Sequence, residues 1–387
     1  MTETIIVAGS LAQRPGHGGH AWVFLQYLLG FRSLGYDVLF LDRLEPGMCV
    51  DASGEPARFT ESENVHFLAA TMDAVGLGSC WSVNYDGGRE WAGVDRASVA
   101  ELVERSGLLL NVMGYLDDDA LRGSAPVTAF LDIDPGFGQM WRELGLHDPF
   151  VGHDHYVTVG SRLGADGCTV PTGGIDWITT LPPVALDAWP VHPPPRGPFR
   201  FTSIATWRGP FGPIEYNGRT YGLRAHEFRR FADLPSNVDA TFEVALDIDP
   251  SDAADRDRLL GFGWLLTDPR HAASGPARYR RYIEGSSAEL MVAKNMYVAS
   301  RGGWFSDRSA CYLATGRPVL VQDTGFGDVV PTGSGIVPFA TFDDAVAGAD
   351  DIIGNYASHA AAARAVAEEY FDARIVLTRL LRELGVA

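Results

Sequence analysis

Residues 4–42 read TIIVAGSLAQRPGHGGHAWVFLQYLLGFRSLGYDVLFLD, and this stretch decides the fold class. Residues 4–10 and 36–42 are apolar and β-branched, which predicts two strands. Between them, apolar side chains recur at helical spacing over residues 21–34 and stop at Gly35, so a helix is expected there. The segment therefore predicts a β-α-β unit.

The same alternation continues along the chain and restarts in its second half. Further strands are expected at 107–114, 127–134, 199–205, 241–248, 263–268, 288–294 and 317–323, with a helix at 307–315 and a helical tail over 343–384. Residues 43–96 are rich in Gly, Ser and aromatics, and loops are expected there. Continuous apolar strands alternating with helices are typical of parallel sheets that are covered on both faces. We predict an α/β protein with two doubly wound, Rossmann-like halves facing a central cleft.

A proline-rich stretch separates the two halves. The chain has 387 residues, more than the roughly 250–300 that one core usually serves. Seven prolines fall between Leu181 and Pro198, which leaves little room for a helix or a central strand. We predict a first domain at 1–181, a linker at 182–198, a second domain at 199–365, and a final helix at 366–387 that packs back on the first domain.

Composition narrows the functional classes. The formal net charge is −18, which argues against nucleic acid or an anionic membrane as the main partner. The four cysteines are scattered and form no CxxC pair, which suits a reducing compartment. Neither a signal peptide nor an apolar run of about 18 residues is visible, so a cytoplasmic protein without a membrane span is expected. The composition is compatible with a homodimer and does not require one.

The glycine-rich loop at residues 16–21 has three interpretations. The letters GHGGHA fit the dinucleotide fingerprint G-x-G-x-x-A, and Asp42 follows at the distance of a ribose-binding acid. This favours an NAD-dependent oxidoreductase that uses Gly16, Gly18, Ala21 and Asp42. About six residues separate the first strand from Gly16, however, which is long for a pyrophosphate turn. The glycines could also serve turn geometry alone, or let a substrate approach the backbone.

His20 is the candidate general base of this loop. It is expected in the first turn of the helix, at the carboxyl edge of the sheet, and imidazole titrates near neutral pH. Asp132 is our choice for an orienting carboxylate, with Asp134 and the acids at 117–119 as alternatives; all of them could also be caps or turn residues. Two D-x-D triplets, at 132–134 and 247–249, could in principle bind a divalent metal. Such triplets are frequent in an acidic chain, so they are weak evidence and we expect no metal.

The second half supplies a candidate anion site. Residues 300–335 read SRGGWFSDRSACYLATGRPVLVQDTGFGDVVPTGSG, with a glycine loop before a helix whose cap is Ser306 or Asp307. Backbone N–H groups at a helix start and an arginine favour an anion. The candidate donor-binding residues are Gly303, Ser306, Asp307, Arg308, Asp323, Thr324 and Gly325, together with Arg208 and Arg224, each of which could instead form a surface ion pair.

These features together resemble the GT-B glycosyltransferases. Residues 307–326, DRSACYLATGRPVLVQDTGF, are similar to the donor-site segment of that superfamily, and residues 14–42 are similar to its first β-α-β unit. The nearest resemblance is to bacterial family-4-like and spore-coat CgeB-type members. It implies a C-terminal helix that crosses to the first domain, and a basic pair, Arg208 and Arg224, that neutralises a diphosphate. Retaining members carry two glutamates in the donor-site region, and at the corresponding positions this sequence has Gly303 and Cys311 instead.

The resemblance implies transfer of a sugar from a UDP- or dTDP-sugar to a small acceptor, without a further cofactor. We expect the acceptor on the first half, near Gly18 and Gly19, with Trp81, Tyr85 and Trp91 forming an apolar or aromatic wall; ordinary core packing of these three rings is the alternative. Other interpretations are a nucleotide-sugar epimerase or phosphorylase on the same fold, the NAD-dependent oxidoreductase, and a binding protein with a degenerate site.

Overall fold

The computed structural model describes residues 3–209 and 211–386, and its first half is built on an eight-stranded sheet. The strand order is β4-β3-β2-β1-β5-β6-β7-β8, and every pair is parallel except β3 with β4. The strands are β1 (Thr4–Ala8), β2 (Asp37–Leu44), β3 (Trp81–Tyr85), β4 (Glu90–Gly93), β5 (Leu108–Val112), β6 (Thr128–Asp132), β7 (His155–Thr158) and β8 (Trp177–Thr179).

Helices cover both faces of this sheet. Alternate residues of β1 divide between two apolar clusters: Ile5 and Val7 pack with α1, whereas Ile6 and Ala8 pack with α3. This alternation follows from the two-residue period of a strand. The helices of this half are α1 (Gly18–Ser33), α2 (Glu63–Ala74), α3 (Arg96–Glu104), α4 (Asp119–Arg122) and α5 (Phe137–Glu143).

The expectation of loops throughout residues 43–96 is wrong. The region contains α2, whose N-cap Ser62 accepts a hydrogen bond from the Val65 N–H, and the two edge strands β3 and β4. The edge pair is short and mixes polar with aromatic residues, so it lacks the continuous apolar signature of the central strands.

The second half is a six-stranded parallel sheet in the order β13-β12-β9-β14-β15-β16. Its strands are β9 (Arg200–Thr206), β12 (Thr241–Asp247), β13 (Leu265–Thr267), β14 (Ala288–Met291), β15 (Val319–Gln322) and β16 (Ile336–Phe339), and a separate hairpin joins β10 (Ile214–Tyr216) to β11 (Arg219–Tyr221). Its helices are α6 (Arg224–Phe228), α7 (Ala253–Gly261), α8 (Pro269–Ala273), α9 (Pro276–Glu284), α10 (Asn295–Ser300) and α11 (Asp307–Ala314).

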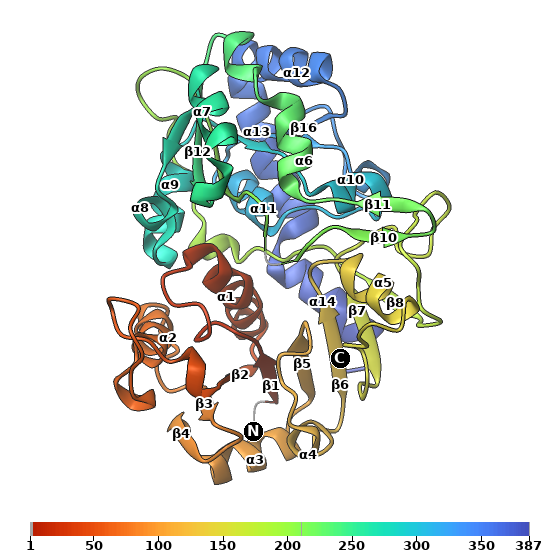
Figure 1. The fold of residues 1–387 in the computed structure, drawn as a ribbon. Helices are drawn as coiled ribbons and strands as arrows, with labels where there is room; N and C mark the ends of the chain where they lie inside the picture. Colours follow the sequence, from red (N-terminus) through yellow and green to blue (C-terminus); the bar gives the residue numbers. More distant parts are fainter. Residues whose placement is uncertain (1–2, 210, 387) are drawn as a thin grey trace.

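The expected helical tail is divided into α12 (Phe342–Gly354), α13 (Tyr356–Val366) and α14 (Ala373–Glu383). The last of these lies against α1 of the first half (Figure 1). Gly30 of α1 makes this contact possible, because a Cβ there would stand 2.5 Å from Leu377 Cδ1 and 2.8 Å from Ala373 Cβ. The predicted class of two doubly wound halves with a returning C-terminal helix is confirmed, whereas the exact domain boundaries stay a prediction.

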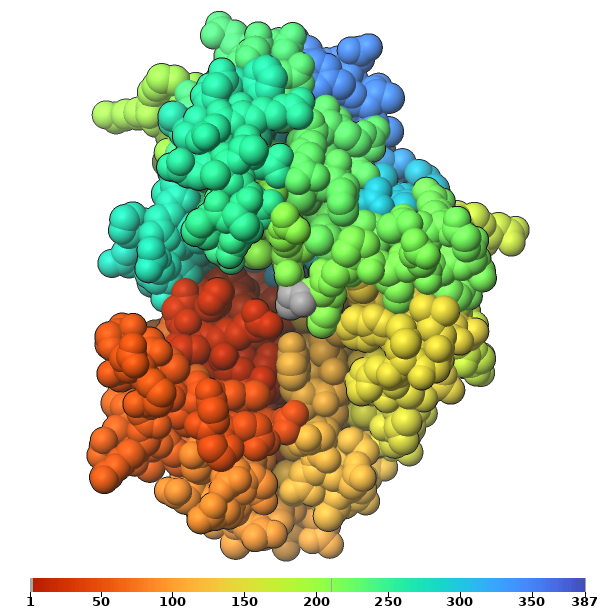
Figure 2. All heavy atoms as spheres, in the orientation of Figure 1, coloured from red at the N-terminus to blue at the C-terminus, as the bar shows by residue number. Residues whose placement is uncertain are grey.

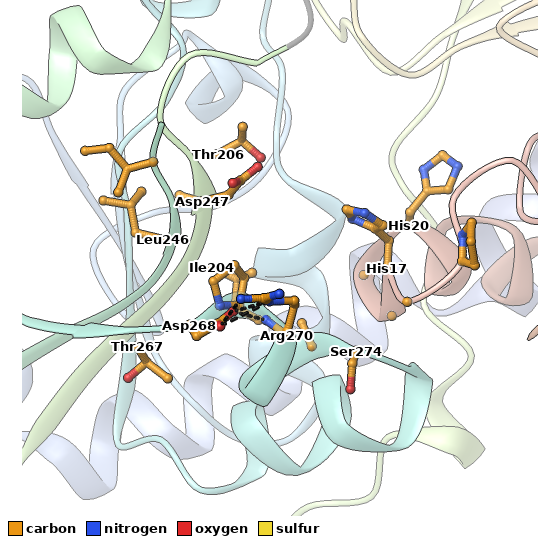
Figure 3. A pocket seen from close by; sticks show the side chains of 18 of the residues that line it. His17, His20, Ile204, Thr206, Leu246, Asp247, Thr267, Asp268, Arg270 and Ser274 are labelled. Carbon is orange, nitrogen blue, oxygen red and sulfur yellow. Dashed lines mark hydrogen bonds and ion pairs between the residues drawn. The ribbon is translucent and has the colours of Figure 1, made fainter. Parts of the chain in front are cut away.

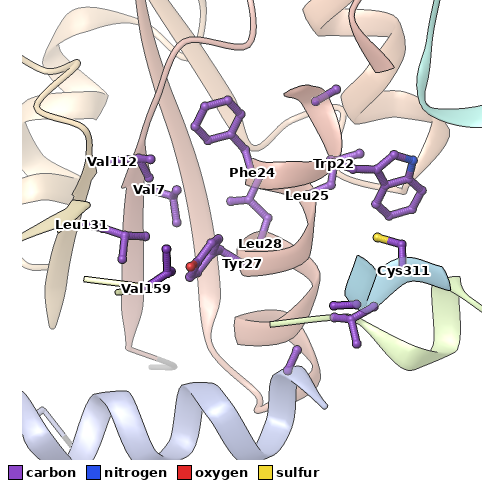
Figure 4. Packing of buried hydrophobic residues seen from close by; sticks show 14 of the residues in the cluster. Val7, Trp22, Phe24, Leu25, Tyr27, Leu28, Val112, Leu131, Val159 and Cys311 are labelled. Carbon is purple, nitrogen blue, oxygen red and sulfur yellow. The ribbon is translucent and has the colours of Figure 1, made fainter. Parts of the chain in front are cut away.

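The hydrophobic core is continuous between the halves. Tyr27 and Leu28 of α1 point toward the strands of the first sheet, while Trp22 lies beside Cys311 of α11 (Figure 4). The Gln26 side chain donates to Cys311 Sγ at 3.3 Å and accepts from the Ala185 N–H at 2.7 Å. Within the described residues, none of the helices is long and apolar enough to span a membrane.

Candidate active site

A cleft of about 1140 Å³ lies where the two sheets face each other. In Figure 2 the first half, coloured red to yellow, meets the second half, coloured green to blue, across the middle of the molecule. The first half contributes the loop before α1, residues 50–54 and Glu63. The second half contributes residues 204–206, 246–248 and 266–270, followed by Arg224, Arg256, Ala273, Ser274 and Arg308. The site is therefore shared between the halves.

The second half lines the cleft with the carboxyl ends of three adjacent strands, β9, β12 and β13. Thr206 and Asp247 extend from these ends toward the side of His17 and His20, and Asp268 and Arg270 lie nearby (Figure 3). Thr267 also lines the cleft, but its hydroxyl donates to Glu243 at 3.1 Å. Ligands of open α/β sheets bind outside these ends. Four of these site residues, Thr206, Thr267, Asp268 and Arg270, were missed in the sequence, and Asp247 was considered only as part of a weak metal triplet. The strand-end rule applied to the predicted strands was sufficient to find them.

Arg308 is held in a fixed orientation beneath this surface. Its Nε donates to Glu289 Oε1 at 2.6 Å, and one terminal nitrogen donates to the Ile204 carbonyl at 2.7 Å. Glu289 lies on β14 and is fully buried. Burial by itself lowers the pKa of Arg308, but the adjacent Glu289 carboxylate and neighbouring groups hold that pKa above its usual value. The other terminal nitrogen, Nη2, is buried without a partner in the described part of the chain.

Arg224 is the second buried cation at the cleft. Its Nε is buried, and no group among the described residues accepts a hydrogen bond from it. Burial, with repulsion from Arg308, lowers the pKa of Arg224 to about 10, so the guanidinium remains charged at neutral pH. Each guanidinium group thus has one donor without a partner among the described residues, and the two positive charges repel each other.

Arg208, the other member of the predicted basic pair, is engaged elsewhere. Its Nε and Nη2 bind the two oxygens of Asp252 at 2.7 and 2.5 Å, and it is absent from the described lining of the cleft. The structure therefore brings Arg224 together with Arg308 rather than with Arg208.

Apart from Arg308, the predicted donor residues between 303 and 325 also lie outside the described lining of the cleft. Gly303 and Gly325 have positive φ and pack against the loop at Ser161 and Arg162 of the first half, where a Cβ on Gly303 would meet Ser161 Oγ at 2.4 Å. Thr324 donates to the Trp304 carbonyl at 2.5 Å, and Asp323 pairs with Arg301 at 3.1 Å. This part of the segment makes contacts between the halves instead of lining the cleft.

Ser306 and Asp307 begin α11 but contribute no side chain to the lining of the cleft. Ser306 is buried and occupies the N-cap position without a side-chain capping bond. Asp307 lines a small enclosed space of about 40 Å³ between the halves, next to Gln26 and Tyr27. Burial raises the pKa of the Asp307 carboxyl. Of the predicted residues in this helix, only Arg308 reaches the described lining of the cleft.

His20 lines the cleft from the first turn of α1. Its Nε2 lies 3.1 Å from the Ser10 carbonyl oxygen and 3.0 Å from Ser10 Oγ. Because a carbonyl oxygen only accepts, this geometry assigns the ring proton to Nε2 and leaves Nδ1 as an acceptor. Burial lowers the pKa of His20 to about 4, so the ring is neutral at physiological pH. His17, one turn earlier, also lines the cleft and is more exposed.

The predicted pairing of Asp132 with His20 is wrong. Asp132 is buried at the end of β6, where its Oδ2 accepts from Gln139 at 2.6 Å and from Thr158 at 2.9 Å. Burial raises the pKa of Asp132 to about 6, against the effect of these hydrogen bonds. Asp134 instead receives bonds from Lys294 and Tyr297 of the second half. The acids at 117–119 are turn and capping residues, with Asp118 capping α4 and Asp117 paired with Arg43.

Asp42 is fully engaged by the loop that precedes α1. Its Oδ2 accepts from the Ala12 N–H at 2.6 Å, and its Oδ1 accepts from the Arg43 N–H at 2.7 Å and from Gln13 at 3.2 Å. The carboxylate thus fixes the loop that leads to His20. Asp42 is buried and lies outside the described lining of the cleft, which counts against its use as a ribose-binding acid there.

The three aromatic residues predicted to wall an acceptor lie at the far edge of the first sheet. Trp81 is buried in β3, Tyr85 stacks on Phe59 with ring centres 4.8 Å apart, and Trp91 donates to the Gly88 carbonyl. Trp81 belongs to the core, the half-buried Tyr85 and Trp91 pack against it, and none of the three belongs to the described lining of the cleft. Gly18 and Gly19 do line it, and a Cβ on Gly18 would stand 2.3 Å from the Gly275 carbonyl oxygen.

Most aspartates of the two D-x-D triplets form hydrogen bonds within the protein and do not line the cleft. Asp249 accepts a backbone bond from Ser251, and only Asp247 faces the cleft. Within residues 3–209 and 211–386, His, Cys, Asp and Glu side chains form no group of three arranged to hold a metal ion.

No family model and no curated protein sequence matches the chain. Solved structures do match over its whole length. An alpha-glucosyltransferase in complex with UDP and a 13-mer DNA has a TM-score of 0.60 at 10% identity, covering 100% of both chains. Sucrose-phosphate synthase from Thermosynechococcus elongatus has a TM-score of 0.56 at 10% identity, covering 99% of each chain.

A third similar structure is AviGT4, a glycosyltransferase involved in avilamycin A biosynthesis, with a TM-score of 0.57 at 12% identity, covering 99% of this chain and 97% of the other. These similarities extend over both halves, the cleft between them and the returning helix, although the CgeB-like subfamily stays a prediction. The chain therefore has the GT-B fold of these glycosyltransferases.

Proposed function

We propose that this protein is a glycosyltransferase that moves a sugar from a UDP- or dTDP-sugar to a small acceptor. The observation that carries the proposal is the pair of buried guanidinium groups at the cleft, Arg224 and Arg308, each with an unpartnered donor. A nucleotide diphosphate supplies the negative charge and the oxygen acceptors that these donors lack.

The same pair serves the chemistry of transfer. The bond between the anomeric carbon and the diphosphate oxygen breaks, its electron pair stays on the diphosphate, and an acceptor oxygen bonds to the anomeric carbon. Negative charge grows on the leaving group in the transition state, where Arg224 and Arg308 are already oriented to stabilise it. The acceptor proton passes to Nδ1 of His20, on the opposite side of the cleft, which gives a product of inverted anomeric configuration.

The two sides of the cleft support transfer over the other interpretations. An epimerase or phosphorylase acting on the donor needs no second binding surface, whereas here the first half also lines the cleft, with two separate segments and Glu63. An NAD-dependent oxidoreductase needs the carboxylate of Asp42, which three hydrogen bonds already engage. A degenerate binding protein has no need of two neighbouring guanidinium groups that each keep a donor without a partner among the described residues.

Nucleotide titration of the full-length chain tests the proposal. We expect UDP or dTDP to raise the melting temperature and to bind measurably in calorimetry, because binding to the folded state alone stabilises it. NAD at the same concentrations should produce no comparable shift. Stabilisation by NAD in place of UDP and dTDP would support the oxidoreductase, and stabilisation by none of the three would contradict a nucleotide-sugar enzyme.

The role of His20 predicts an unusual pH profile. A base acts in its neutral form, and the pKa of His20 lies at about 4, so kcat/KM should stay level from pH 8 down to about pH 5. His20→Ala should lower kcat by about 10²–10⁴-fold and leave the Kd of UDP nearly unchanged. His66→Ala, on the exposed surface of α2, is the matched control. An acidic limb near pH 6.5 that persists in His20→Ala would show that another group is the base.

A further inference from the structure

The two sides of the cleft carry opposite charge. On the second half, arginines 224, 256, 270 and 308 line it together with two aspartates, one of which, Asp268, is paired with Arg270. On the first half, the charged lining residues are the acids Asp51 and Glu63, beside the histidines of the α1 loop. Among the described lining residues of that half, Lys, Arg, Phe, Tyr and Trp are all absent.

A rigid framework holds Glu63 and Asp51 at the cleft. Glu63 is the first residue of α2, and its N–H donates to the Val50 carbonyl at 2.7 Å. The buried Asn64 accepts from the Val50 N–H at 2.9 Å and donates to the Ala12 carbonyl at 2.8 Å. These bonds join the start of α2 to residues 50–54 and to the loop that carries the histidines, so the acidic side of the cleft is fixed before any ligand arrives.

Both acids keep acceptor capacity that the described residues do not use. Asp51 Oδ1 accepts from the Ser53 N–H, Ser53 Oγ and the Glu55 N–H at 2.6–3.1 Å, and its Oδ2 is free of such bonds. The half-buried Glu63 carboxylate has neither an ion pair nor a side-chain hydrogen bond within the described residues. Carboxylates only accept, so these oxygens call for N–H or O–H donors.

The cleft has room for a second molecule beside the donor. Its volume of about 1140 Å³ exceeds the ~300–1,000 Å³ typical of a site for one drug-sized ligand. The unpartnered donors of Arg224 and Arg308 place the anionic donor against the second half. The acidic lining of the first half is therefore left for the other substrate.

We propose that the acceptor is a hydroxylated molecule that carries a protonated amine, of the amino sugar or aminocyclitol class, with its ammonium group held by Glu63 and Asp51. This inference rests on the proposed function and names the acceptor class of the same cleft. An aromatic acceptor finds no Phe, Tyr or Trp ring among the described lining residues, and carboxylates repel an anionic acceptor such as DNA. Hydroxyl groups of the acceptor find further partners in Ser53 and His17.

The test compares pairs of acceptors in which a protonated amine is replaced by a neutral acetamide. The probes are D-glucosamine with N-acetyl-D-glucosamine, and 2-deoxystreptamine with its di-N-acetyl derivative, each titrated into the full chain saturated with UDP. We expect each amine to bind about tenfold more tightly than its acetylated partner, since a hydrogen bond to a charged group is worth more than a neutral one. Glu63→Gln should abolish this preference and leave the Kd of UDP unchanged.

Glu61→Gln is the control, because Glu61 lies two residues away on the surface, pairs with Arg58, and is outside the described lining. It should keep the preference for amines. The inference is overturned if both members of every pair bind equally or not at all. It is also overturned if p-nitrophenol or a 13-mer DNA binds more tightly than the amines. If UDP still binds in that case, the proposed function stands; loss of the proposed function would show instead as a failure of UDP and dTDP to bind.

Discussion

Arg224→Met is expected to weaken the binding of UDP or dTDP by about 10²-fold while leaving the free protein at least as stable as the wild type. The two effects have opposite signs because the Nε of the buried guanidinium has no partner within the described residues and the group is repelled by Arg308. Removing it relieves the free protein of an unsatisfied charge, whereas the bound diphosphate loses a charge-assisted hydrogen bond. Calorimetry with UDP and urea denaturation of the free protein measure the two quantities.

Arg208→Met is the matched control for Arg224→Met. Arg208 comes from the same region of the second half, but its guanidinium is bound by the buried Asp252. Its replacement should lower the free energy of unfolding and leave the Kd of UDP unchanged, which is the reverse of the Arg224 result. If Arg208→Met weakens UDP binding more than Arg224→Met does, the diphosphate site lies elsewhere and the proposed arginine pair is wrong.

Glu289→Ala is expected to lower the free energy of unfolding by about 3–5 kcal/mol, because breaking a buried ion pair leaves an uncompensated charge. Glu289 is fully buried, and its Oε1 accepts from Arg308 Nε at 2.6 Å. Without this carboxylate, Arg308 stays buried beside Arg224 with nothing to offset the repulsion. Urea denaturation at neutral pH measures the change.

A double variant separates stability from binding at this pair. Glu289→Leu with Arg308→Met replaces both ions by apolar side chains of similar volume, which is often neutral or stabilising. We expect most of the lost stability to return while UDP binding stays weak, because Arg308 Nη2 is missing. A loss below about 1 kcal/mol in Glu289→Ala would mean that the pair is much less desolvated than its burial indicates.

The sequence predicts the central strands well and the edges poorly, for a physical reason. β1, β5 and β6 are buried on both faces, so their residues are continuously apolar and easily recognised. β8 has three residues, and β16 contains a proline, so neither carries a pattern that separates it from a loop. These short strands form because neighbouring strands offer them hydrogen-bond partners, which is a tertiary effect.

The candidate site was predictable only in part, for a similar reason. His20 and Arg308 reach the cleft because each lies in the first turn of a helix, α1 and α11 respectively, that begins at the cleft. Arg208 and Arg224 are indistinguishable by local pattern, and the choice between them is made by Asp252, which lies 44 residues beyond Arg208. Gly303 was assigned to a ligand, whereas its missing side chain makes room for the loop at Ser161 of the other half.

The return of α14 to the first half has a consequence for the order in which the protein matures on the ribosome. The core of the first half includes Leu377, Leu380 and Leu381, which are synthesised only after the whole of the second half. The first half is translated long before them and must wait with part of its apolar surface uncovered. Unlike an N-terminal domain that folds from its own residues alone, this one closes its core only after α14 has left the exit tunnel.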